Sequence, residues 1–155
     1  MRFVVQVCSE ASVEVEGKEV GAIGSGALVL VGIGREDTRE IADRMVKKLL
    51  GLRIYPDEEG KTNLSLQAVG GSLLIVSQFT LYADCRKGNR PSFFKAGEPE
   101  EAERLYLYVA EKCRAAGFPV ERGVFGAEMK IRLVNEGPFT VVLDSDELFG
   151  KKEEG

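Results

Sequence analysis

The chain has 155 residues, of which 44% are hydrophobic and 30% are charged, and its formal net charge is −4. These values are typical of one soluble globular domain with a sizeable core, and they argue against broad non-specific nucleic-acid binding, although not against a local basic patch. The chain contains no His, which excludes Ser-His-Asp and Cys-His nucleophile machinery and His-ligated metal sites.

Targeting signals and metal motifs are not apparent in the sequence. No apolar run is long enough to span a membrane, and residues 1–8 lack the features of a signal peptide. We therefore expect a cytoplasmic protein without a membrane partner. Cys8, Cys85 and Cys113 are widely separated, which favours reduced structural thiols over a disulfide framework or a metal knuckle. We expect neither a metal nor a cofactor.

The first half of the chain is rich in strand patterns. Alternating or continuous apolar runs predict strands at residues 2–8, 11–15, 19–23 and 27–33. The first helix is expected over residues 37–50, with Asp37 and Glu40 as a capping box and Gly51 at its end. A short strand at 52–55 and an edge segment at 63–66 are expected to follow, on either side of a turn.

The second half starts with a buried apolar strand at residues 73–76 and continues into a loop at 83–97 that has no periodicity. A second helix is expected to begin at Pro99 and to end before Gly117. Further strands are expected at residues 120–125, 129–134 and 140–143. Residues 144–155 are polar and charged, and we expect them to fray.

About eight short strands with two inserted helices favour the α+β class over alternating βαβ units. We expect a curved, barrel-like, mostly antiparallel sheet with two helices packed outside. The sequence has no internal repeat and no linker. A single domain is therefore expected over residues 1–145, followed by a polar C-terminal tail over residues 146–155.

The apolar strand at 73–76 leads into polar residues that could serve a substrate. Ser77 and Gln78 follow the strand, and Phe79 and Thr80 come next. A strand packed on apolar neighbours is a rigid mount for such side chains. Polar residues are also common at strand ends, and Ser77 and Thr80 would point to opposite faces of a regular strand. The pattern alone leaves a functional and a structural role open.

A second unusual stretch contains the dipeptide Gly137-Pro138. An X-Pro bond can be cis at modest cost, and Gly permits close approach of a ligand or another backbone. A cis Gly-Pro unit could point two carbonyl oxygens toward a ligand ammonium group, whereas the alternative is an ordinary loop turn. We expect this stretch and the one around Ser77 to face each other.

The loop at 83–97 is basic within an acidic protein. Its four cations and two aromatic residues are Arg86, Lys87, Arg90, Lys95, Phe93 and Phe94. The pattern fits a solvated loop, and it also fits a phosphate-contacting patch with aromatic side chains nearby.

Four motifs occur together and in a fixed order. They are Ser-Gln-Phe-Thr-Leu at 77–81, Lys-Gly-x-Arg-Pro-Ser-Phe at 87–93, Phe-Gly-Ala-x-Met at 125–129 and Asn-x-Gly-Pro-x-Thr at 135–140. With these motifs, and with its opening strand and Ala-Ser-Val hairpin, the chain resembles the D-aminoacyl-tRNA deacylase family up to about residue 143.

The resemblance implies a hydrolase of carboxylic esters that releases a D-amino acid, or glycine, from the terminal adenosine of tRNA as a step of translation quality control. It also implies RNA binding, with aminoacyl-tRNA as the partner, and a homodimer whose active site lies at the subunit interface. In the family, the Gly-Pro motif of one subunit enters the site of the other. Carried over here, Gly137 and Pro138 would form a Gly-cisPro motif that holds the α-amino group of the substrate and rejects L side chains by exclusion.

The resemblance also assigns the substrate-binding residues. It implies contacts from Phe125, Gly126, Ala127 and Met129, with Phe125 and Met129 beside the adenosine, where stacking on the base is physically sensible. Their apolar character is equally compatible with a place in the core.

Thr80 matches a possible nucleophile of the family, with Ser77, Gln78 and Phe79 next to it. An alcohol nucleophile needs a base, and the chain has no His. We therefore expect the 2′-hydroxyl of the tRNA or a bound water to assist the attack. Backbone N–H groups around Phe79 and Thr80 would stabilise the oxyanion, and Gln78 and Ser77 would orient the ester and the water.

Two positions depart from the family pattern. Val7 replaces an Arg that is thought to fix the Gly-Pro turn, and Phe139 replaces a Val. These changes leave open a deacylase of relaxed chirality. A tRNA-end binding module without turnover is the second alternative. Lys87 and Arg90 of the basic loop are candidate tRNA contacts of the deacylase. An amidase or peptidase is a weaker hypothesis because no nucleophile–base pair is visible.

Overall fold

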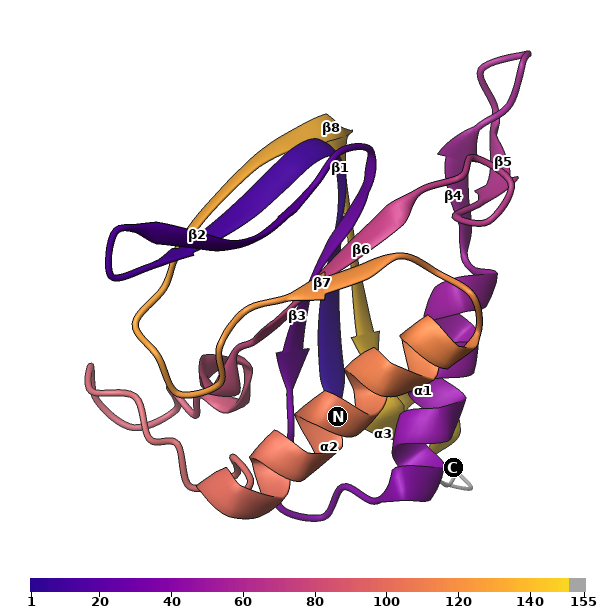
Figure 1. Ribbon diagram of the computed structural model, residues 1–155. Coiled ribbons are helices and arrows are strands. Elements are labelled where there is room, and N and C mark those ends of the chain that lie inside the picture. The colour runs from indigo at the N-terminus through magenta and orange to yellow at the C-terminus, as the bar shows by residue number, and fades with distance from the viewer. Residues whose placement is uncertain (151–155) are drawn as a thin grey trace.

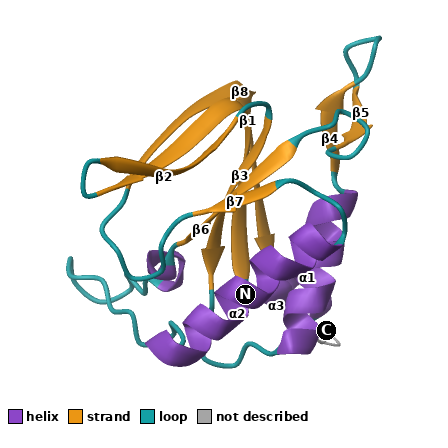
Figure 2. Ribbon diagram, viewed as in Figure 1, coloured by secondary structure: helices purple, strands orange, loops and turns teal. Residues whose placement is uncertain are grey.

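The computed structural model describes residues 1–150 of the chain, which form one mixed sheet, a separate hairpin and a set of helices (Figures 1 and 2). The strands of the mixed sheet are β1 (Arg2–Val15), β2 (Lys18–Ile23), β3 (Gly26–Gly32), β6 (Ser72–Ser77), β7 (Val120–Arg122) and β8 (Lys130–Asp144). The hairpin consists of β4 (Arg53–Pro56) and β5 (Thr62–Ser65). The helices are α1 (Arg39–Gly51), α2 (Pro99–Ala115), the short α3 (Ser145–Phe149) and the 3-10 helix η1 (Phe79–Tyr82).

Strand β1 organises the sheet. Its first half pairs with β3, its second half pairs with β2, and β8 pairs along its other edge, all antiparallel. β3, β6 and β7 then run parallel to one another. β2 bends over and contacts β6 and β7, so the sheet nearly closes into a barrel (Figure 1). The predicted α+β class, with a curved, barrel-like and mostly antiparallel sheet, is confirmed.

The core follows from the alternation of side chains along the strands. One face of the sheet buries residues such as Phe3, Val29 and Ile75 in the larger apolar cluster, together with the inward faces of α1 and α2. The opposite face buries a smaller cluster that includes Leu28 and Leu74. The helices α1 and α2 lie side by side on one side of the sheet (Figure 2). Both faces of the central strands are therefore apolar, as expected for buried parallel strands.

The structure contains two long strands where the sequence predicted shorter ones. Residues 2–8 and 11–15 belong to the single strand β1, because β8 pairs with β1 on both sides of the irregularity near Cys8. In the same way, residues 130–144 form one strand, and the Gly-Pro stretch is a bulge within it. β7 ends at Arg122 rather than at residue 125.

Helix α1 begins differently from the prediction. Its N-cap is Thr38, whose hydroxyl accepts a hydrogen bond from the Ile41 amide at 3.3 Å, so the capping role predicted for Asp37 is wrong. The Asp37 carboxylate accepts instead from the Met1 ammonium group at 2.7 Å and from the Gly34 amide at 2.6 Å. A buried ammonium group is a stronger attraction for a carboxylate than a helix amide is.

The fraying expected from residue 144 onward is wrong for residues 145–149, which form α3. The hydroxyl of Ser145 is buried and accepts a hydrogen bond from the Met1 ammonium group at 2.7 Å. This contact joins α3 to the start of β1. Residues 151–155, which the same prediction covered, lie outside the described residues. Across residues 1–150, none of the helices has the length and apolar character needed to cross a membrane.

Candidate active site

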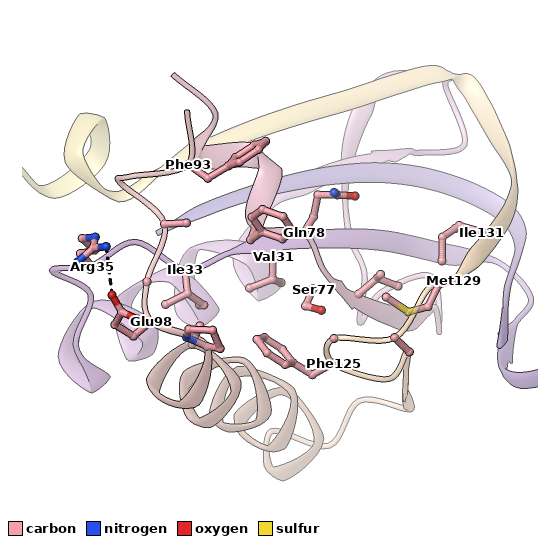
Figure 3. Close-up of a pocket in the computed structure, with 18 residues that line it drawn as sticks. Val31, Ile33, Arg35, Ser77, Gln78, Phe93, Glu98, Phe125, Met129 and Ile131 are labelled. Atoms are coloured by element: carbon pink, nitrogen blue, oxygen red, sulfur yellow. Dashed lines mark ion pairs between the residues drawn. The ribbon is translucent and has the colours of Figure 1, made fainter. Parts of the chain in front are cut away.

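Three parallel strands end at the same edge of the sheet. Val31 of β3 pairs with Ser77 of β6, and β7 runs parallel to β6. The segments that follow these strands therefore meet, and they surround a cavity of about 600 Å³ (Figure 3). This volume lies within the range of small-molecule sites.

The cavity gathers two groups of residues that the sequence had proposed. From the end of β6 come Ser77, Gln78 and Phe79, and from the bend after β7 come Phe125, Gly126, Ala127 and Met129. The remaining candidates do not line it. They are the exposed residues Thr80, Lys87, Arg90, Gly137 and Pro138.

The end of β6 offers both side-chain and backbone donors. The hydroxyl of Ser77 points into the cavity, and the Gln78 side chain points away from it (Figure 3). The Gln78 amide nitrogen Nε2 donates to Thr80 Oγ1 at 2.5 Å. The backbone N–H groups of Phe79 and Thr80 open η1 and donate to no other group within residues 1–150. Two backbone donors are therefore available next to the cavity.

Helix α2 fixes this strand end from behind. The buried hydroxyl of Tyr106 donates to the Ile75 carbonyl at 2.7 Å, and the same carbonyl accepts from the Gly123 amide at 3.1 Å. Burial raises the pKa of Tyr106 to about 12, so the hydroxyl stays protonated and keeps its role as donor near neutral pH. These bonds tie α2, β6 and the bend after β7 into one rigid support for the site.

The bend over residues 123–129 folds back on itself at Gly123. A Cβ at this position would lie 2.6 Å from the sulfur of Met129, so a larger residue would have to displace the Met129 side chain from its place beside the cavity. The Phe125 ring packs against Tyr106, with ring centroids 5.9 Å apart. Phe125 and Met129 thus face the cavity from two sides (Figure 3).

Several lining residues were not predicted as part of the site. Arg35 follows β3, and its guanidinium pairs with the Glu98 carboxylate at 3.1 Å across the cavity mouth (Figure 3). Phe93 also lines the mouth. The segment that carries Phe93 reaches the end of β3 through a hydrogen bond from the Gly97 amide to the Ile33 carbonyl at 2.9 Å. No periodicity in the sequence signals such a long-range pairing; the only available signal was the charged residue directly after an apolar strand.

The Gly-Pro stretch protrudes from β8. Gln6 pairs with Thr140 and Cys8 pairs with Asn135, so the residues between Asn135 and Thr140 form a bulge. The peptide bond between Gly137 and Pro138 is cis, and both residues are exposed. Neither lines the cavity of the same chain, so the expectation that the two stretches face each other is not met within one chain.

A hydrogen-bonded network holds this bulge. Asn135 Oδ1 accepts from the Phe139 amide at 3.0 Å, and Asn135 Nδ2 donates to Gln6 Oε1 at 2.8 Å and to Thr140 Oγ1 at 3.1 Å. The Thr140 hydroxyl also donates to Gln6 Oε1, at 2.9 Å. The Val7 side chain is buried in the larger core cluster. Gln6, rather than residue 7, therefore anchors the bulge to β1.

The buried thiols are poor nucleophiles. Burial raises the pKa of Cys113 to about 12 and also raises the pKa of Cys8. Both groups are therefore uncharged thiols near neutral pH, whereas attack requires a thiolate. In the part of the chain that the structure describes, no three His, Cys, Asp or Glu side chains gather as a metal site would.

Comparisons with known proteins agree on one family. The family model described as D-Tyr-tRNA(Tyr) deacylase matches residues 4–144. Proteins named D-aminoacyl-tRNA deacylase from Desulfitobacterium hafniense (strain DSM 10664 / DCB-2) and Thermomicrobium roseum are 55% and 56% identical to the chain. The first match covers 96% of this chain and 100% of the relative, and the second covers 97% of each.

Solved structures show the same fold. A structure described as the c-Myc DNA Unwinding Element Binding Protein superposes with a TM-score of 0.88 at 41% identity, covering 93% of this chain and 98% of that chain. A structure described as a probable eukaryotic D-amino acid tRNA deacylase has a TM-score of 0.79 at 22% identity, covering 92% and 97%. At 22% identity, the similarity to the second structure supports the fold and nothing further.

Proposed function

Because this chain belongs to the D-Tyr-tRNA(Tyr) deacylase family, we propose that it is a D-aminoacyl-tRNA deacylase that hydrolyses the ester between a D-amino acid, or glycine, and the terminal adenosine of tRNA. The observation that carries this proposal is the cavity at the ends of β3, β6 and β7. It gathers Ser77, Gln78 and Phe79 on one side and the bend over residues 125–129 on the other. An enzyme that binds an aminoacyl nucleoside needs both a wall for the base and donors for the ester.

The proposed reaction uses few protein groups. The adenosine lies between Phe125 and Met129, and the ester carbonyl points at the backbone N–H groups of Phe79 and Thr80. A water, positioned by Ser77 or by the 2′-hydroxyl of the tRNA, attacks the carbonyl carbon and forms a tetrahedral oxyanion, which the two N–H groups stabilise. Collapse breaks the bond to the ribose oxygen, which takes up the proton lost by the attacking water, and releases the free amino acid and tRNA. An aminoacyl ester is already activated, so positioning supplies much of the rate.

Thr80 is a positioning residue in this mechanism. Its hydroxyl oxygen already accepts a hydrogen bond from the Gln78 amide at 2.5 Å, and an amide cannot serve as a base. The residue is exposed and lies outside the cavity lining. Without a base, the hydroxyl cannot be activated for attack.

Thr80→Val and Thr80→Ala are therefore expected to release D-Tyr from D-Tyr-tRNA at rates within about threefold of the unchanged protein, whereas loss of a true nucleophile costs several orders of magnitude. Single-turnover release of the free amino acid measures this, with Thr62→Val, an exposed site on β5, as the matched control. A loss of more than about a thousandfold in both Thr80 variants would establish Thr80 as the nucleophile. If the unchanged protein shifts tRNA in a gel but releases no amino acid, the binding-module alternative holds instead.

Chiral selection is proposed to involve two subunits. The exposed Gly137-Pro138 turn of one subunit would enter the cavity of its partner in a homodimer, and its carbonyl oxygens would accept hydrogen bonds from the α-ammonium group of the substrate. An L side chain would then collide with the wall. Two observations support this proposal: the turn protrudes from β8 and lies outside the cavity of its own chain.

The buried side chain of Val7 keeps the relaxed-chirality alternative open, because this position contributes no polar contact to the turn.

Lys87 and Arg90 are proposed as contacts to tRNA phosphates. Since the substrate is used in protein synthesis, we propose the cytoplasm as the place of action. The division into a domain over residues 1–145 and a polar tail over residues 146–155 stays a prediction, which the family match to residues 4–144 supports.

A further inference from the structure

Two exposed phenylalanine rings line the mouth of the cavity, and a third lies beside Arg35, which also lines it. Phe79, Phe93 and Phe94, here called the aromatic ledge, are 56%, 38% and 72% exposed. Phe79 and Phe93 meet edge to face, with ring centroids 5.0 Å apart, and both line the cavity. Such a group of exposed aromatic rings around one opening marks a binding surface rather than scattered surface residues.

Arg35 holds the Phe94 ring of the aromatic ledge in place. Its guanidinium carbon lies 4.9 Å from the centroid of the Phe94 ring, and its Nε donates to the Phe94 carbonyl. The Arg35 amide also donates to the Lys95 carbonyl at 3.1 Å. Ala96, the next residue along, is buried. The ledge is therefore a preformed surface fixed to the end of β3, which lowers the entropy cost of binding.

Unpaired cations accompany the ledge. The loop leading to it is closed by paired backbone bonds between Asp84 and Ser92, at 2.7 and 2.9 Å. Within residues 1–150, Lys87, Arg90 and Lys95 form no ion pair, whereas Arg86 is paired with Asp84 at 2.7 Å. Hydrogen bonds from Arg86 hold the pKa of the Asp84 carboxyl at about 2, so that pair stays ionised and neutral overall. The remaining loop cations are free to meet anionic groups.

We propose that the aromatic ledge binds the unpaired nucleotides that precede the terminal adenosine of tRNA. This inference rests on the proposed function, because a cavity of about 600 Å³ accommodates one nucleoside with its amino acid and little more. The nucleotides before it must leave through the mouth. Their bases stack on Phe93 and Phe94 without sequence preference, and their phosphates meet the loop cations.

Two substrates distinguish binding at the aromatic ledge from the hydrolytic reaction itself. D-Tyr-tRNA carries the unpaired nucleotides, and a D-tyrosyl ester of adenosine lacks them. Phe94→Ala is expected to lower kcat/KM for D-Tyr-tRNA about tenfold, as loss of one stacked base does, and to leave hydrolysis of the adenosine ester unchanged. Arg35→Gln is also expected to lower kcat/KM for D-Tyr-tRNA, because it releases Phe94.

Matched controls exist on other faces. Val69→Ala removes an exposed apolar side chain in the turn after β5. Arg39→Gln removes a guanidinium that lies 5.2 Å from the Tyr108 ring, away from the cavity. Neither control is expected to change the rate at which either substrate is hydrolysed. The proposal would be overturned if Phe94→Ala lowered kcat/KM equally for both substrates, or lowered it for neither. It would also be overturned if sedimentation showed that the substitution dissociates a dimer.

Direct binding tests the ledge even if no ester is cleaved. Fluorescence anisotropy of a labelled short single-stranded RNA ending in adenosine gives the affinity of the uncharged end. We expect Kd to rise about tenfold in Phe94→Ala and to rise with salt in the unchanged protein. Cleavage of neither ester by the unchanged protein would refute the proposed function. An unchanged Kd in Phe94→Ala would refute the ledge.

Discussion

Two variants that are each nearly inactive on D-Tyr-tRNA are expected to regain activity when mixed. In the first, Gly137→Val, the turn is lost because Gly137 has φ of +124° and a Cβ there would lie 3.0 Å from the Phe139 amide nitrogen. A β-branched residue cannot adopt that backbone conformation without strain. In the second, Ala127→Trp, an indole enters the cavity that Ala127 lines.

The recovery follows from the proposed homodimer, in which the active site would be shared between subunits. In a mixed dimer, one site combines an open cavity with an intact turn, and the other site carries both changes. Random exchange makes about half of the dimers mixed, so the mixture should regain about one quarter of the activity of the unchanged protein. Each variant alone is expected to lose at least about a hundredfold.

The measurement is release of D-Tyr after the two variants are unfolded and refolded together. The control is the same treatment of each variant alone, with circular dichroism to show that both are folded. If mixing folded variants restores nothing after subunit exchange has been verified by mass, each chain carries a complete site, and the shared active site is wrong.

Asn135→Ala is expected to reduce the preference for D-Tyr-tRNA over L-Tyr-tRNA by about tenfold or more. The change removes the acceptor for the Phe139 amide and the donor to Gln6 Oε1, and each such bond contributes on the order of 1 kcal/mol. A turn that is no longer held can move aside for an L side chain. Initial rates on both esters measure the preference.

Asn135→Asp is the informative companion, because it keeps an acceptor for the Phe139 amide and loses the donor to Gln6 Oε1. We expect an intermediate preference. Arg132→Ala is the control on the same strand, since this exposed side chain forms an ion pair with the Glu14 carboxylate at 3.4 Å and, within residues 1–150, no hydrogen bond to the bulge. Equal falls in both rates, with their ratio unchanged, would mean that the network supports the fold and has no part in chiral selection.

Local patterns placed one part of the candidate site at the end of a strand, whereas the residues around Phe125 were assigned by the resemblance to the family. The apolar run before Ser77 predicts a buried strand, and the residues after such a strand lie at an edge of the sheet. The bend around Phe125 follows another strand of the same parallel set. Parallel strands end at a common edge, so these two stretches meet even though they are far apart in the sequence.

The errors came from contacts that local patterns do not encode. Asp37 has the spacing of a helix cap, but the Met1 ammonium group, distant in sequence, takes its carboxylate. Residues 145–149 open a stretch that is mostly polar and charged, yet Ser145 is buried and contacts the same group. Arg35 was missed for a similar reason, because its partner Glu98 lies at the start of α2.

The most direct test of the account is hydrolysis of D-Tyr-tRNA and L-Tyr-tRNA side by side by the purified protein. We expect rapid release of D-Tyr, and release of L-Tyr that is slower by about a hundredfold or more, because a site that excludes one enantiomer discriminates strongly. Equal rates on the two esters would contradict chiral selection by the Gly137-Pro138 turn, and Val7 would then be the first residue to replace by Arg.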